Sequence, residues 1–150
     1  MRPKPGLDIE RVSFYDFFAA NPFLLPPNNR AHSAFSLAGF AESNLSYQSS
    51  GQRFANARAR LQFDLAVLVA RGVVVASVTN KRVTYSATEV GTTIAGQLHS
   101  LYARAYSESA TLVARLLDRL SDSSLRKSAR QWLRAEALMI DLYETEPIRP

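Results

Sequence analysis

The sequence contains no cysteine among its 150 residues and only two histidines, His32 and His99. Without cysteine the chain cannot form disulfides, thiolate metal sites or a cysteine nucleophile. Neither histidine has a second metal-ligating residue three or four positions away, so no metal site is predicted.

Long apolar runs are also missing. No stretch approaches the roughly 20 apolar residues that a membrane-spanning helix needs. The first residues, MRPKPGLDIERVSF, lack the apolar core of a secretory signal. We therefore expect a cytoplasmic protein that forms one domain over residues 1–150, with its core between about residues 8 and 143.

Patterns of catalytic residues are equally scarce. The close carboxylate pairs fall at helix or chain ends, where solvation or the helix dipole accounts for them. The serines have no nucleophile elbow around them, and the glycines do not form a phosphate-binding loop. We expect a chain that is not an enzyme and that needs no cofactor.

Positive charge is concentrated in one part of the chain. Residues 50–86 carry a net charge of +5, which equals the formal net charge of the whole sequence. The cations are Arg53, Arg58, Arg60, Arg71, Lys81 and Arg82, against the single carboxylate of Asp64. Such a patch suits phosphates or an acidic protein surface, and a solvated basic face is an equal alternative.

Helical spacing and end signals define two early helices. Asp8 is a predicted N-cap, and Asn21 before Pro22 predicts the end of the first helix. A second helix is predicted over Gln52–Arg71, with Gly72 as its left-handed C-terminal residue. Residues 22–51 are predicted to be loops around a short helical piece near residues 33–40.

The first helix is rich in aromatic residues, which occupy most of its circumference and so predict burial on more than one side. They are Phe14, Tyr15, Phe17 and Phe18. We predict core packing over docking of a partner protein, and both remain open at this stage.

A hairpin is predicted after Gly72. The β-branched runs GVVVASV and RVTYS flank a turn at Thr79-Asn80-Lys81. Ser86 and Glu89 have the spacing of a capping box, which predicts a helix starting at Ala87. That helix is predicted to be one long element, or two with a kink near residues 107–109.

A last helix is predicted after the SDSS break at residues 121–124. Its expected buried residues are Leu125, Ala129, Trp132, Leu133, Ile140 and Tyr143. A basic stripe lies on its other side, at Arg126, Lys127, Arg130 and Arg134. We expect solvation or contacts within the chain to account for this stripe.

The order of the predicted elements indicates a fold that is mainly α with a small β-hairpin. Helix, helix, hairpin and long helices are typical of a winged-helix-like domain with long C-terminal helices. The Gln52–Arg71 helix would then take the recognition position, and Lys81-Arg82 the wing tip.

Several of these segments resemble a known family. They are Tyr15-Asp16-Phe17-Phe18, Arg71-Gly72, Tyr85, Ala87, Thr88, Leu98, Ser100, Tyr102 and Ala110. Over roughly residues 11–120 the sequence is similar to the middle component of bacterial ABC three-component defence systems of the Lamassu antiphage type. The segment from Pro26 to Ser50 departs from the family's expected turn.

The resemblance implies a non-catalytic subunit that bridges an SMC-like or Rad50-like ATPase and an effector, often a nuclease. The charge map fits this role, since Arg53, Arg58, Arg60, Lys81 and Arg82 on the basic helix and wing could contact DNA or an acidic partner. The alternative is a free-standing winged-helix transcription regulator, dimeric through its C-terminal helices. A regulator would bind a short duplex specifically, whereas an isolated subunit would bind DNA weakly and without specificity.

Overall fold

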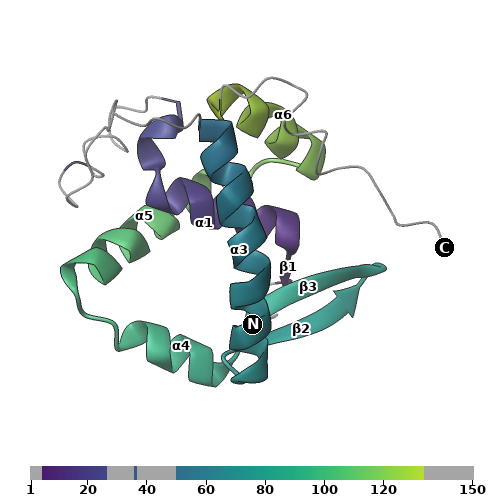
Figure 1. The fold of residues 1–150 in the computed structure, drawn as a ribbon, viewed down its shortest axis with the longest axis vertical. Coiled ribbons are helices and arrows are strands. Elements are labelled where there is room, and N and C mark those ends of the chain that lie inside the picture. Colours follow the sequence, from purple (N-terminus) through teal and green to yellow (C-terminus); the bar gives the residue numbers. More distant parts are fainter. Residues whose placement is uncertain (1–4, 27–35, 37–49, 134–150) are drawn as a thin grey trace.

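The computed structural model describes residues 5–26, 36 and 50–133 (Figure 1). The helices in this part are α1 (Ile9–Ala20), the 3-10 turn η1 (Pro22–Leu24), α3 (Ser50–Ala70), α4 (Glu89–Gly96), α5 (Leu101–Leu117) and α6 (Asp122–Leu133). The strands are β1 (Leu7–Asp8), β2 (Val74–Thr79) and β3 (Arg82–Ala87). The predicted fold, mainly α with a small hairpin, is confirmed. Residue 36 is helical, and the rest of the helical piece predicted near residues 33–40 lies outside the described residues, as do Arg134, Ile140 and Tyr143.

The ends of α1 and α3 follow the local signals in the sequence. The Asp8 side chain accepts a hydrogen bond from the Arg11 amide at 2.9 Å, as an N-cap should. Asn21 closes α1 by donating its amide to Phe17 O at 2.9 Å. After α3, Gly72 has a φ of +69°, a conformation that costs glycine little.

The hairpin has a two-residue loop, and both loop residues have positive φ, 51° for Asn80 and 64° for Lys81. Positive φ at both positions is what a type I′ turn requires, and it matches the twist of the strands. The sequence did not predict β1, which pairs with β3 and makes a three-stranded sheet in the order β1-β3-β2. The short β1 therefore places the start of α1 beside the hairpin.

Two predicted helix boundaries in the second half are wrong. The N-cap of α4 is Thr88, whose hydroxyl accepts from Gly91 N at 3.0 Å, while Ser86 pairs with Val75 inside the sheet. The break between α4 and α5 falls at residues 97–100, where Ser100 caps α5, and not near residues 107–109. Ser109 stays within α5 because its buried hydroxyl donates to Ala19 O of α1 at 2.6 Å.

The core lies where α1, α5 and α6 meet the first half of α3 (Figure 1). Phe14 stacks on Phe54 of α3 with ring centroids 5.0 Å apart. Phe18 is completely buried and meets Trp132 of α6 edge to face at 5.5 Å. The other core residues are Phe17, Leu25, Val113, Leu117, Leu125, Ala129 and Leu133.

A close backbone contact attaches the start of α4 to the hairpin. A Cβ on Gly91 would lie 2.1 Å from the carbonyl oxygen of Val73, so only glycine allows this approach. Thr88 strengthens the contact, since its hydroxyl donates to Gly72 O at 2.7 Å. From this point α4 leads away from the helical core (Figure 1).

Candidate functional site

The arginines of α3 do not lie on one face of the helix. Arg53 and Arg60 are two turns apart and share a side, whereas Arg58 is about 160° away from Arg60 around the axis. Arg60 is exposed, and Arg53 and Arg58 are half-buried. No carboxylate in the described part of the chain forms an ion pair with any of the three.

The two cations at the hairpin tip have different surroundings. Lys81 is exposed and has no ion pair within the described residues. Arg82 points back to the helices, where Nη1 lies 3.1 Å from Asp122 Oδ2 and 3.4 Å from Asp8 Oδ2. Arg82 therefore holds the hairpin against the core, and Lys81 is the more accessible charge.

Arg11, which no pattern in the sequence indicates, is the centre of this polar network. Its Nε donates to Asp122 Oδ1 at 2.8 Å, and its Nη1 donates to Tyr15 Oη at 3.1 Å. The guanidinium also reaches the carbonyls of Leu117 and Leu120, just before α6 begins. The hydrogen bond from Arg11 is the main reason why the pKa of Asp122 is lowered.

The aromatic residues of α1 face inward. Phe14, Phe17 and Phe18 are buried in the chain's own core, so these rings are not accessible for docking. Tyr15 is half-buried and donates to Asp118 Oδ1 at 2.6 Å. Burial and this hydrogen bond raise the pKa of Tyr15 to about 12, against an opposing effect of Arg11.

One residue of the basic stripe on α6 forms an ion pair within the chain. Arg126 forms an ion pair with Glu10 of α1, so its partner comes from another helix. Lys127 is exposed, and Arg130 is half-buried. The fourth residue, Arg134, lies outside the described residues.

Exposed apolar side chains follow one another along α4, the loop after it and the start of α5. These side chains are between 44% and 88% exposed, and they belong to Val90, Ile94, Leu98, Leu101 and Tyr102. We call this set the α4–α5 surface. The long helix predicted from Ala87 is interrupted at residues 97–100, and this break separates α4 from the core. A set of exposed apolar side chains such as this is a candidate interaction surface.

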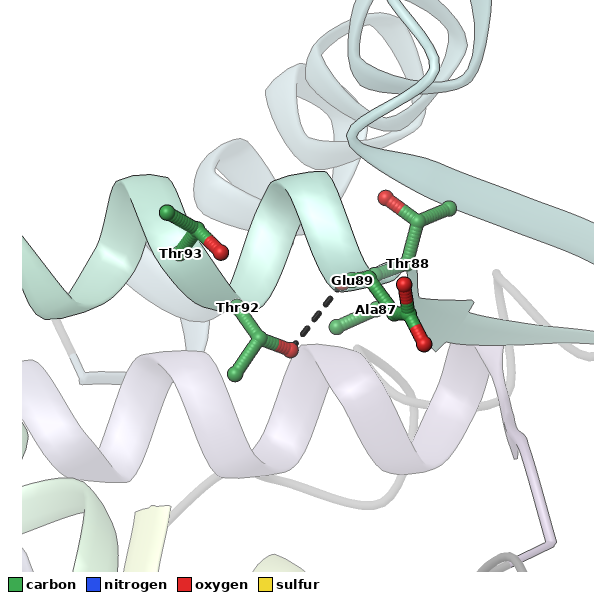
Figure 2. A pocket seen from close by; sticks show the side chains of 5 residues that line it. All are labelled: Ala87, Thr88, Glu89, Thr92 and Thr93. Atoms are coloured by element: carbon green, nitrogen blue, oxygen red, sulfur yellow. Dashed lines mark hydrogen bonds between the residues drawn. The ribbon is translucent and has the colours of Figure 1, made fainter.

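A shallow depression lies beside the start of α4 (Figure 2). Its lining includes Glu89 and the hydroxyls of Thr88, Thr92 and Thr93. Thr88 caps α4, and Thr92 donates to Thr88 O at 3.0 Å, so two of these hydroxyls have structural roles. In the described residues no group of three His, Asp or Glu side chains is placed to hold a metal ion.

The described helices do not meet the requirements of a membrane span. None of them combines the length and the apolar character that crossing a bilayer demands.

Comparison with known proteins identifies the family. No curated protein matches the sequence, and no solved structure matches it. A family model described as "ABC-three component (ABC-3C) system Middle Component 2" matches residues 41–136, nearly two-thirds of the chain. The matched residues include α3, the hairpin, α4, α5 and α6, and they begin after α1. The chain therefore belongs to the middle component 2 family of ABC-three component systems.

Proposed function

We propose that this protein is a non-catalytic subunit of an antiphage defence complex of the Lamassu type, and that it bridges an SMC-like or Rad50-like ATPase and an effector subunit. Family membership carries the proposal, because a middle component has partner components by definition. The α4–α5 surface supports it physically. Its exposed apolar side chains would stabilise a complex, because their burial against another protein is favourable in free energy.

The outward face of α3 favours contact with protein over the reading of DNA sequence. Phe63 is 70% exposed at the centre of this face. Ala59, Ala66 and Ala70 surround it at helical spacing and are exposed. These four side chains cannot donate or accept the hydrogen bonds by which proteins distinguish base edges in the major groove, and they outnumber Asn56 and Arg60, the exposed polar residues beside them on this face. This observation weighs against the alternative of a winged-helix transcription regulator.

Purification of a tagged chain expressed with the neighbouring genes of its operon tests the proposed function. We expect two other proteins to co-purify, a large ATPase with coiled-coil arms and a second component. Recovery of this chain alone, or as a homodimer that binds one short duplex specifically, would contradict the proposal and support the regulator.

Replacing Leu101 with glutamate should weaken this assembly. Leu101 is 88% exposed, so the substitution should leave the folded state intact, but it places a charge at the centre of an apolar contact. We expect at least a tenfold loss of co-purified partner, measured by quantitative mass spectrometry. Thr111→Glu, at an exposed position of the same helix, is the matched control and should retain the partners. Equal recovery with both variants would exclude the α4–α5 surface from the interface.

The isolated chain should bind duplex DNA weakly and without sequence preference. Non-specific dissociation constants are on the order of 10⁻⁴–10⁻⁶ M at physiological salt. Replacing Arg53, Arg60 and Lys81 together with alanine should reduce affinity about tenfold and flatten the salt dependence. We leave Arg82 unchanged, because its guanidinium already forms ion pairs with Asp8 and Asp122.

A second triple variant controls for the loss of net charge. It replaces Arg104, Arg115 and Arg119 of the α5 region, all exposed, with alanine. Fluorescence anisotropy on a labelled duplex compares the two variants. The same loss of affinity in both would mean that DNA responds to net charge and not to α3 and the hairpin tip.

A further inference from the structure

The strand β2 forms an open edge of the sheet. In the order β1-β3-β2 it pairs only with β3, and five of its six residues are exposed. Figure 1 shows β2 on the side of the hairpin away from β1 and α1. An edge strand presents a row of backbone N–H and C=O groups to any segment that can pair with them.

The register identifies which groups point outward. Thr88 N donates to Val73 O at 3.1 Å, so Val73 and Thr88 form a hydrogen-bonded pair. Such pairs alternate along an antiparallel ladder, and the backbone groups of Val75, Ser77 and Thr79 therefore face β3.

The remaining three residues of the strand, Val74, Ala76 and Val78, direct their N–H and C=O groups away from β3. No group within the described residues forms a hydrogen bond with these outward amides and carbonyls. They are free to pair with an added strand.

This edge lacks the features that normally prevent strand pairing. Residues 74–79 contain no charged residue and no proline, and the one-to-one register with β3 excludes a bulge. One face of the hairpin is apolar as well. Val78 lies opposite Val83, and the two are 75% and 49% exposed. An added strand would gain both a hydrogen-bond ladder and apolar contacts.

Charge argues against a second copy of this chain as the added strand. Symmetric antiparallel pairing with Ala76 facing Ala76 would place Lys81 of each copy near Arg71 of the other. Both cations are exposed, and neither has an ion pair in the described part of the chain. Like charges at both ends of the ladder oppose self-pairing, whereas carboxylates there would be attracted.

We propose that the outer edge of β2 accepts an extended segment of another component of the complex, uncharged at its centre and acidic at its ends. The inference rests on the proposed function, because it takes the partner from the same assembly. The hairpin would then bind a protein strand through its edge, in addition to any contact that Lys81 makes at its tip.

Two substitutions at one position test the proposal in the co-expressed complex. Ala76→Pro removes an outward N–H without removing a bond to β3, whereas Ala76→Val keeps the N–H and suits a strand. We expect Ala76→Pro to lower recovery of one component at least tenfold, and Ala76→Val to recover it like the unchanged chain. Thermal unfolding of the isolated variants checks that both fold. Full recovery with a folded Ala76→Pro variant would overturn the proposal.

Amide hydrogen exchange gives a test that does not depend on a variant. On assembly, the amides of Ala76 and Val78 should exchange at least tenfold more slowly, while that of Ser77 is already protected by β3. An intact complex without this alternating protection would overturn strand addition and leave the proposed function standing. Protection that rises with the concentration of the isolated chain would identify a second copy of this chain as the added strand. That result would also overturn the proposal of a strand from another component. Failure of the unchanged chain to bind either component would instead refute the proposed function.

Discussion

Replacing Phe18 with alanine should lower the free energy of unfolding by about 3–5 kcal/mol. The ring is completely buried between α1 and α6, with Phe17 at 5.8 Å and Trp132 at 5.5 Å between centroids. Its removal would leave a cavity that rings on two helices line. Urea unfolding can be followed through Trp132, because it is the only tryptophan and lies against Phe18.

Phe63→Ala is the matched control for this substitution. The same side chain is removed, but Phe63 is 70% exposed on α3, so the expected change is within about 0.5 kcal/mol. A loss below about 1 kcal/mol for Phe18→Ala, or equal losses for the two variants, would contradict the core described above.

The parts of the fold that the sequence predicted correctly have strong signals close by in the chain. Asp8, Asn21 before Pro22, and Gly72 each end or begin a helix by their own chemistry. The hairpin turn is similar, because Asn80 tolerates the left-handed conformation that the two-residue loop requires.

The errors occurred where two local signals competed. Ser86 and Thr88 are both N-capping residue types, and only the pairing of Ser86 with Val75 decides that the helix begins after Thr88. The strand β1 has two residues, too few for a periodic pattern, and it exists because β3 offers it an edge. Contacts between distant segments made these choices.

The candidate site could be predicted as a list of cations but not as an arrangement. Charge counting found Arg82, yet nothing near it in the sequence indicated its ion pairs with Asp8 and Asp122. Arg11 was missed for the same reason, since Asp122 lies 111 positions later in the chain.

The apolar residues between positions 94 and 102 have helical spacing, yet the isolated chain exposes their side chains. Ile94, Leu98 and Leu101 keep the spacing of a buried helical stripe but extend away from the core on α4 and at the start of α5. Under the proposed function the spacing has a physical explanation, because burial would be completed by a partner subunit. Such a sequence pattern reflects the assembly and not the single chain.

Replacing Arg11 with alanine should lower the free energy of unfolding by about 2–3 kcal/mol at pH 7. The substitution leaves the carbonyls of Leu117 and Leu120 without this donor and removes the main hydrogen-bond partner of Asp122. Arg82→Ala is the control. It removes an exposed guanidinium that also contacts Asp122, so salt and water screen the interaction and the loss should be below about 1 kcal/mol. Urea titrations measure the free energy of unfolding of both variants.

The pH dependence separates the Asp122 charge from the packing of the Arg11 side chain. Because the pKa of Asp122 is lowered in the folded state, its stabilising contribution is present above the usual value of 3.8 and is lost as the pH falls through the folded value. The difference in stability between the unchanged protein and Arg11→Ala should therefore shrink as the pH falls from 5 toward 2. The decrease should be modest, because the Asp122 side chain is 45% exposed. A difference that stays constant over this range would mean that Arg11 stabilises the fold only through its packing and its hydrogen bonds to the carbonyls of Leu117 and Leu120, with Asp122 contributing nothing measurable.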